Sequence, residues 1–228
     1  MPILTGPLRG RRWVSDSATH GCWLGTYERE LQEMFVAHVK PGDVVFDVGA
    51  NVGFFTLLSS LLVGVRGRVV AFEPLPRNLA LLRRHLEVNA VGNATVVAAA
   101  VADEPGSGFL GEAASPSQGS LSTGSSAGCV VRVVALDPLV ADGMLPAPSV
   151  MKIDVEGAES RVLSGARSIL SIHRPVLFLS GHGYRQQALC ADVLAGHGYD
   201  LVTWRDGRSD GQYETLARPG AGAARSDD

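Results

Sequence analysis

Apolar residues along the chain gather in short, nearly continuous runs that are separated by stretches with helical spacing. Such runs are typical of strands that are buried on both faces, whereas helical spacing repeats apolar residues at every third or fourth position. Strands are predicted over 43–49, 67–74, 94–102, 149–157 and 174–181. Helices are predicted over 51–63, 76–90, 158–173 and 184–198, and a closing hairpin over 199–218 with its turn at 207–211.

This alternation of strands and helices predicts an α/β fold with a mostly parallel, doubly wound sheet, which ends in an antiparallel strand. Ligands bind such sheets beyond the carboxyl ends of the strands, close to the point where the strand order reverses. The first predicted strand runs into the turn at Asp47 to Gly53. We therefore expect a ligand site at this turn.

Composition and charge fit a globular domain with a small-molecule partner. The 228 residues are 46% hydrophobic and 19% charged, and the formal net charge is −3. This length is enough to bury a full core, and the charge creates no field that favours nucleic acid or an anionic membrane. The most apolar segment, 54–65, is shorter than the roughly 20 residues that span a bilayer. The oligomeric state stays open, a homodimer included.

The cysteines and the N-terminus favour a cytoplasmic location. Cys22, Cys129 and Cys190 are odd in number and lack metal-site spacing, which suits a reducing compartment. The N-terminus has no apolar core of a signal peptide, which argues against secretion. The arginines near it, at positions 9, 11 and 12, favour a solvated leader over a phosphate-binding patch.

Changes in composition divide the chain into a main domain and two end segments. We expect an N-terminal leader over 1–26, one domain over 27–218 and a disordered tail over 219–228. A segment rich in glycine and serine, 104–128, interrupts the domain after the third predicted strand. A long loop inside a compact domain is either functional or flexible, so this segment is a lid over the site or an insertion.

The turn in FDVGANVG lacks the middle glycine of a dinucleotide-binding fingerprint. That glycine lets the backbone approach a pyrophosphate, and Asn51 stands in its place. No lysine follows Gly53, which excludes a phosphate-binding P-loop. A ligand with polar and cationic groups but without phosphates fits Asp47 and Gly49 better, and S-adenosylmethionine is such a ligand.

Glu73 ends the second predicted strand, where a carboxylate could accept hydrogen bonds from both hydroxyls of a ribose. The same feature serves nicotinamide cofactors, so it does not discriminate by itself. Gly49 and Gly53 could also be turn and packing residues, and Asp47 could cap the following helix. Four such residues at two strand ends nevertheless favour a cofactor site.

The stretches MKIDVEGAE and FLSGHGY place polar residues at two further strand ends. Asp154 ends an apolar strand, where an unpaired carboxylate costs stability, so a functional role is favoured. Glu159 follows in the first turn of a helix, where stabilisation of the helix dipole explains it. Ser180 and His182 end the next strand, and His182 is either a functional residue or a surface residue.

FDVGANVG, FEP, MKIDVEGAE and RPVLF followed by GH resemble, in this order and spacing, the FkbM-type family of S-adenosylmethionine-dependent methyltransferases. The resemblance covers roughly residues 27–216 and implies a Rossmann-like class I methyltransferase fold. It also implies O-methylation of a hydroxyl on a small molecule, such as a sugar or a natural-product intermediate. The segment GTYERE looks like the family's entry helix, which adds Tyr27 and Glu28 as contacts to the cofactor or the substrate.

One departure from the family concerns Ser180, because members typically carry a glutamate there, two residues before the histidine. An alcohol acceptor needs its proton removed by a base or by metal coordination. Asp154 and His182 are the candidates for catalysis, with His182 the favoured base near neutral pH. The two residues could instead hold Mg²⁺, but the missing glutamate leaves a thinner ligand set, so metal is not favoured.

Two other functions stay open. An NAD-dependent oxidoreductase would share Glu73, but Asn51 and the absence of a Tyr-x-x-x-Lys pair count against it. A non-catalytic protein that binds S-adenosylmethionine is the alternative that Ser180 supports. The predicted cofactor-binding residues are Glu28, Asp47, Gly49, Asn51, Gly53, Glu73 and Asp154.

Overall fold

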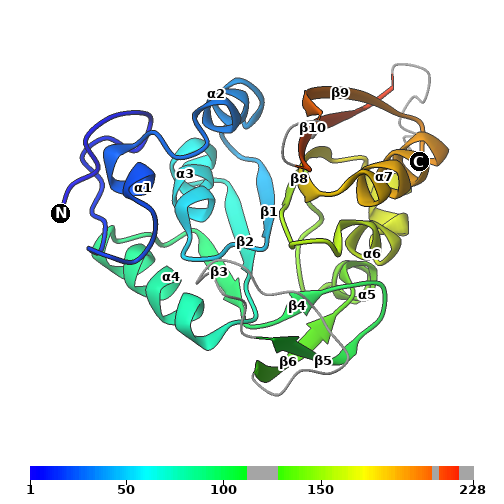
Figure 1. Cartoon of the computed structure of the whole chain (residues 1–228), viewed down its shortest axis with the longest axis horizontal. Helices are drawn as coiled ribbons and strands as arrows, with labels where there is room; N and C mark the ends of the chain where they lie inside the picture. The colour runs from blue at the N-terminus through cyan, green and yellow to red at the C-terminus, as the bar shows by residue number, and fades with distance from the viewer. Residues whose placement is uncertain (112–127, 207–210, 221–228) are drawn as a thin grey trace. The chain divides into compact units, whose positions relative to one another are not determined.

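The computed structural model describes residues 1–111, 128–206 and 211–220. The chain forms two compact units, Met1–Ala98 and Ala99–Asp228, which are described one at a time (Figure 1). Within the described residues, no helix has both the length and the apolar character that a bilayer span requires.

The first unit is built from parallel strands that are joined by helices. Its strand order is β3-β2-β1, and register pairs Asp47 with Ala71 and Val48 with Phe72. Each connection passes through a helix, as parallel pairing requires. The elements are β1 (Val44–Val48), α3 (Phe54–Val63), β2 (Arg68–Phe72), α4 (Pro76–Val88) and β3 (Ala94–Val97). The carboxyl ends of these strands therefore lie at one edge of the unit.

The N-terminal residues of this unit pack against α4 (Figure 1). Trp13 is buried and stacks on His85 with 3.8 Å between ring centroids. The backbone N–H of Val14 donates to His85 Nε2 at 3.1 Å, and His85 Nδ1 lies 2.7 Å from the carbonyl oxygen of Val52. Because an N–H can only donate, Nε2 accepts and the ring proton sits on Nδ1. Burial lowers the pKa of His85.

Two short helices complete the first unit: α1 (His20–Leu24) and α2 (Arg29–His38). The segment 1–26, predicted as a leader, contributes the side chains of Ile3, Leu8 and Trp13 to the buried core. Arg9 and Arg12 are exposed, whereas Arg11 is half-buried. The N-terminal segment is thus a structural part of this unit.

The second unit holds two sheets. The larger has the order β7-β8-β10-β9, in which β7 and β8 are parallel and β10 is antiparallel to both neighbours. The smaller has the order β4-β6-β5. The strands are β4 (Ala100–Val101), β5 (Gly106–Gly111), β6 (Gly128–Val134), β7 (Val150–Ile153), β8 (Val176–His182), β9 (Tyr199–Asp206) and β10 (Gln212–Pro219). The helices are α5 (Leu136–Ala141), α6 (Glu159–Ser164), the π-helix η1 (Ile169–His173) and α7 (Tyr184–Gly196).

Three predicted elements differ from the structure. The strand predicted over 94–102 is two strands, β3 and β4, which belong to different sheets. The helix predicted over 158–173 is interrupted after Ser164, where a Cβ on Gly165 would meet the carbonyl oxygen of Ala102. The segment predicted as a loop, 104–128, begins as strand β5, because 106–111 pairs with β6.

The remaining part of that segment, 112–127, lies outside the described residues, and so does the hypothesis of a lid. The predicted disordered tail falls mainly on 221–228, which also lies outside them. The predicted closing hairpin is confirmed as β9 and β10, which pair antiparallel.

Candidate functional site

The turn after β1 is built from backbone in the left-handed region. Gly49, Asn51 and Gly53 have φ values of 81°, 51° and 92°. The N–H groups of Gly49 and Ala50 both donate to the carbonyl oxygen of Phe72, at 3.0 and 2.9 Å. The turn therefore folds back over the carboxyl end of β2. Asparagine tolerates this backbone region better than most side chains do, which explains a non-glycine residue at position 51.

Gly53 directly precedes α3 and also permits close packing of α4. A Cβ at this position would lie 2.3 Å from Leu82 Cδ1. The positive φ and this close approach both favour glycine here. The glycine is needed for the packing of the turn itself.

Asp47 supports the turn from within the unit. Its side chain is fully buried, and its Oδ2 accepts a hydrogen bond of 2.6 Å from Thr56 Oγ1 on α3. The N-cap residue of α3 is Gly53 and not Asp47. The bond instead ties β1 to α3. Thr56 was not predicted as a site residue, because this pairing depends on how the helix lies on the strand.

Glu73 joins the end of β2 to the turn. Its Oε2 accepts from the N–H of Asn51 at 2.9 Å, and its Oε1 accepts from the N–H of Leu75 at 2.9 Å and from Asn78 Nδ2 at 3.3 Å. Burial raises the pKa of Glu73, and these hydrogen bonds oppose the rise. A carboxylate has about four acceptor positions, so three protein donors leave roughly one for a ligand. Asn78 is a second residue that sequence reasoning missed.

Tyr27 and Glu28 lie in the same unit, and Tyr27 packs next to the start of α3. The Tyr27 ring meets Phe54 edge-on, with 5.3 Å between centroids. Glu28 directly precedes α2 and has a φ of 45°. A non-glycine residue in this region costs on the order of 1–3 kcal/mol, and such residues concentrate at functional sites. The structure thus places Tyr27 against Phe54, the residue that follows the glycine turn, and Glu28 is its neighbour in sequence.

In the second unit, Asp154 follows β7 and forms an ion pair. Lys152 Nζ lies 3.0 Å from Asp154 Oδ2, and the two side chains are 3% and 21% exposed. A buried ammonium requires such a partner. The pair gives Asp154 a structural reason for its position, which adds to the functional role predicted from sequence. Lys152 was not predicted as a site residue.

The loop after β7 is held by two helices. Glu156 and Gly157 have positive φ values of 52° and 96°. The N–H of Gly157 donates to Glu159 Oε1 at 2.9 Å, and Gln186 Nε2 on α7 donates to the carbonyl oxygen of Gly157 at 2.6 Å. Glu159 therefore acts at the start of α6, in agreement with the structural explanation of this residue.

Strand β8 ends beside a carboxylate that the sequence did not predict. Ser180 Oγ donates to Glu214 Oε2 at 2.7 Å, and the two residues are direct partners in the β8–β10 register. Ser180 is buried and Glu214 is half-buried. The backbone of His182 pairs with Gln212, and the side chain of His182 lies outside what the structure describes.

The sequence left Mg²⁺ at Asp154 and His182 possible without favouring it, and the described residues give no support for such a site. No group of three or more histidine, cysteine, aspartate or glutamate side chains in the described residues could hold a metal ion. Asp154 already faces the ammonium of Lys152, and a second cation at the same carboxylate oxygen would be repelled. We therefore derive no step through a metal.

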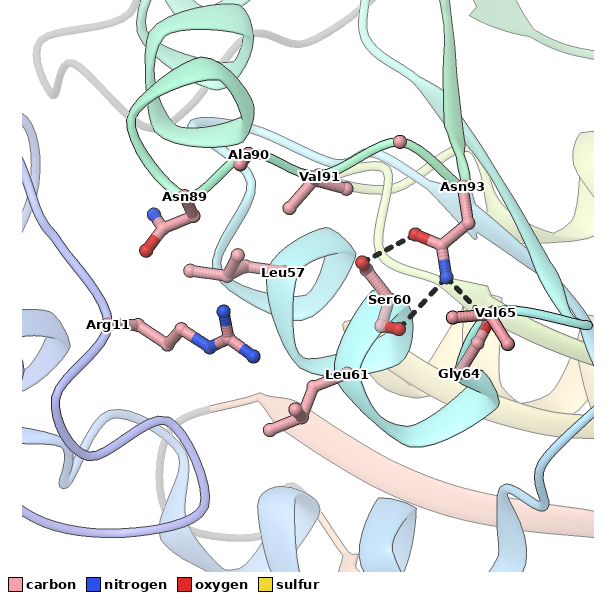
Figure 2. Close-up of a pocket in the computed structure, with 11 residues that line it drawn as sticks. Arg11, Leu57, Ser60, Leu61, Gly64, Val65, Asn89, Ala90, Val91 and Asn93 are labelled. Carbon is pink, nitrogen blue, oxygen red and sulfur yellow. Dashed lines mark hydrogen bonds between the residues drawn. The ribbon is translucent and has the colours of Figure 1, made fainter.

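A separate hollow of about 380 Å³ lies in the first unit (Figure 2). None of the predicted site residues lines it. Ser60 Oγ donates to Asn93 Oδ1 at 2.6 Å, and Asn93 Nδ2 donates to the carbonyl oxygens of Ser60 and Gly64, which ties α3 to the start of β3. Its lining residues are Arg11, Leu57, Ser60, Leu61, Gly64, Val65, Asn89, Ala90, Val91, Gly92 and Asn93.

Comparison with solved structures shows the fold, and comparison with family models shows the family. The chain is similar to a structure titled Methyltransferase FkbM from Methylobacillus flagellatus KT, with a TM-score of 0.55 and 18% identity, over 90% of this chain and 56% of that one. The predicted fold class is confirmed: this is the Rossmann-like fold of class I methyltransferases. The family model described as Methyltransferase FkbM domain matches residues 47–201. The chain belongs to the FkbM methyltransferase family.

Two relatives that are named as methyltransferases support this family assignment. The chain is 32% identical over 206 residues to the 31-O-demethyl-FK506 methyltransferase FkbM of Streptomyces tacrolimicus, which covers 74% of this chain and 76% of that protein. It is 29% identical over 145 residues to the hexuronic acid methyltransferase AglP of Haloferax volcanii, which covers 63% of this chain and 58% of that protein. The protein is an S-adenosylmethionine-dependent methyltransferase, as predicted.

Proposed function

We propose that this enzyme transfers a methyl group from S-adenosylmethionine to a hydroxyl of a small molecule. The observation that carries the proposal is the bridge between the two strand ends, in which Glu73 accepts from the N–H of Asn51. The bridge holds the Glu73 carboxylate, which can accept a further hydrogen bond, beside a turn that lacks the glycine and lysine of phosphate-binding loops. Two relatives are named as methyltransferases of 31-O-demethyl-FK506 and of hexuronic acid, which supports a small-molecule acceptor.

The residues of the first unit fit the cofactor by the chemistry of their donors and acceptors. When bound, S-adenosylmethionine supplies a methyl group that its sulfonium already activates. Glu73 would accept from a ribose hydroxyl, and the backbone at Gly49 and Asn51 would lie against the ligand. Glu28 and Tyr27 would meet its methionine end. Asp47 is fully buried and would act by holding the turn through Thr56, together with any contact to the ammonium group.

The residues of the second unit would serve the acceptor. Ligands bind at the carboxyl ends of parallel strands, and Asp154 and His182 lie at these ends of β7 and β8. The protein must hold the acceptor oxygen in line with the methyl group, at about 3 Å, and exclude water. His182 is proposed as the base that takes the hydroxyl proton. Asp154, oriented by Lys152, and Glu214, oriented by Ser180, would accept hydrogen bonds from the acceptor.

We also propose that the enzyme works in a reducing compartment and needs no divalent ion. Cys22, Cys129 and Cys190 are free thiols, which suits a reducing compartment such as the cytoplasm. Turnover should not require a divalent ion, because the ammonium of Lys152 already faces Asp154. A chelator should therefore leave the rate unchanged, and rescue of a chelated enzyme by Mg²⁺ would contradict this.

Two measurements test the function. Calorimetric titration of the full chain should show binding of S-adenosylmethionine and none of NADH, and the reverse result would favour an oxidoreductase. Tritium from the labelled methyl group should pass to 31-O-demethyl-FK506, to a hexuronic acid or to a hydroxyl compound in an extract of the source cells. The product should be a methyl ether. Cofactor binding without transfer to any of these acceptors would favour a non-catalytic binding protein.

A further inference from the structure

The hollow in the first unit contains a single charged residue. Of its lining residues, Arg11 alone carries a charge, and its guanidinium points between Leu57 and Leu61 (Figure 2). The side chain is half-buried, and none of the ion pairs among the described residues includes it. A partly buried cation without a partner is unfavourable unless a ligand or solvent meets it. This arrangement makes the guanidinium available to an anion that enters the hollow.

The backbone around Arg11 is fixed. Asn89 clamps the next residue from both sides, because its Oδ1 accepts from the N–H of Arg12 at 2.7 Å and its Nδ2 donates to the carbonyl oxygen of Arg12 at 2.8 Å. The N–H of Ile3 donates to the carbonyl oxygen of Arg11 at 2.8 Å. A site that is organised before binding pays less conformational entropy when the ligand arrives. The backbone at Arg11 is therefore held in place independently of any ligand.

The walls opposite the cation are apolar and partly open to water. Leu57 is buried, whereas Leu61 is 38% exposed and Val65 is 99% exposed. Ala90 and Val91 complete the apolar lining. The amide of Asn93, which also lines the hollow, is occupied by bonds to Ser60 and Gly64. The Asn93 amide therefore has its own partners within the protein, and the ligand would meet mainly the apolar side chains at that end of the hollow.

We propose that this hollow is a binding site for a small organic carboxylate with an apolar body. Small-molecule sites are commonly hollows of about 300–1,000 Å³ with apolar walls and a few placed polar groups. The planar fork of arginine matches a carboxylate with two parallel hydrogen bonds. One guanidinium balances one negative charge, so a monoanion fits better than a phosphate, which brings up to two charges. The apolar body would cover Leu61 and Val65.

This site is distinct from the proposed cofactor site. The two share no residue, and the carboxylate would bind without taking part in methyl transfer. Asn89 and Arg12 connect the hollow to α4, which also carries Asn78, a donor to Glu73. The inference itself rests only on the hollow and does not depend on the proposed function.

Titration of the full chain with octanoate, followed by amide NMR signals, tests the site. The signals of residues 57–65 and 89–93 should shift, with 1-octanol and acetate as controls that lack the charge or the apolar body. Arg11→Met keeps an apolar side chain and should weaken octanoate binding about tenfold or more, the scale of a charge-assisted hydrogen bond. Arg9→Met, a change at an exposed neighbour outside the hollow, should leave the affinity unchanged.

Several results would overturn the proposal. Octanoate that shifts no signal around the hollow, or binds Arg11→Met as well as the natural protein, would remove the site. Equal binding of 1-octanol would show a merely apolar patch, and equal binding of acetate would indicate an adventitious ion only. S-adenosylmethionine should bind Arg11→Met normally. Failure of the natural protein to bind S-adenosylmethionine would contradict the proposed function and would not bear on the octanoate result.

Discussion

Gly53 carries two constraints that a pair of substitutions can separate. Its φ of 92° penalises any side chain, and a Cβ would also meet Leu82 Cδ1 at 2.3 Å. Gly42 has nearly the same backbone, with a φ of 95°, but nothing within 4 Å of a Cβ. Gly42→Ala should therefore cost only the backbone penalty, about 1–2 kcal/mol. Gly53→Ala should cost about 1–3 kcal/mol more, because Leu82 must move.

Unfolding of both glycine variants in urea measures these costs. Equal destabilisation by the two changes would show that the contact with Leu82 relaxes freely. Glycine at position 53 would then be required only for its backbone conformation.

His85 predicts how the first unit responds to acid. Burial lowers its folded-state pKa, so the neutral ring is favoured by the fold and protonation by the unfolded chain. This contribution to stability is complete above the unfolded pKa of about 6.5 and is lost as the pH falls towards the folded pKa. The unfolding free energy should drop below pH 6.5, by at most about 1.4 kcal/mol per pH unit from this residue.

The matched measurement compares the natural protein with His85→Gln between pH 7 and pH 5. In the variant, the unfolding free energy should depend less steeply on pH. Its stability at pH 7 should be lower, because the hydrogen bonds to Val14 and Val52 change. The fluorescence of Trp13, which stacks on His85, should follow the transition. Identical slopes in the two proteins would contradict the explanation.

At the scale of elements, hydrophobic periodicity predicts the strand–helix–strand units well. The predicted helix over 51–63 corresponds to α3 at 54–63, and that over 76–90 to α4 at 76–88. Periodicity fails where tertiary contacts decide the end of an element. Nothing in the apolar run at 94–102 reveals that its two ends pair with different sheets. The break at Gly165 depends on the backbone of Ala102, more than 60 residues away in sequence.

Because β8 pairs with β10, we expect that a glutamate at position 180 can replace the glutamate at position 214. Ser180 and Glu214 are direct register partners, so exchanging them keeps one hydroxyl and one carboxylate in contact. Glu214→Ser should lower methyl transfer by about 10²-fold, if the carboxylate orients the acceptor. Ser180→Glu combined with Glu214→Ser should restore at least a tenth of the activity, because the carboxylate returns to the same pair.

The control for this exchange is Arg218→Ser, an exposed change on the same strand that should leave the rate unaltered. Affinity for S-adenosylmethionine should be equal in all these variants. If Glu214→Ser is fully active, Glu214 has no role at the acceptor. If the double exchange is no better than the single change, the carboxylate cannot act from position 180.

At the scale of the whole molecule, the predicted residues divide between two compact units. Glu28, Asp47, Gly49, Asn51, Gly53 and Glu73 belong to Met1–Ala98, whereas Asp154 and His182 belong to Ala99–Asp228. Strand-end positions were predictable because apolar runs stop there. Their partners were not: Thr56, Asn78, Lys152 and Glu214 are ordinary helix and strand residues in sequence. Only register and packing show which side chains these residues meet.

The central claim is that Glu73 and the adjoining turn bind the cofactor, and calorimetric titration with S-adenosylmethionine tests it most directly. Glu73→Ala should weaken binding by about 1.5–3 kcal/mol, roughly 10- to 150-fold, the scale of hydrogen bonds to a charged group. Glu87→Ala, which breaks only an exposed pair with Arg84, should bind as the natural protein does. Circular dichroism must show that both variants are folded. An unchanged affinity in folded Glu73→Ala would contradict the account.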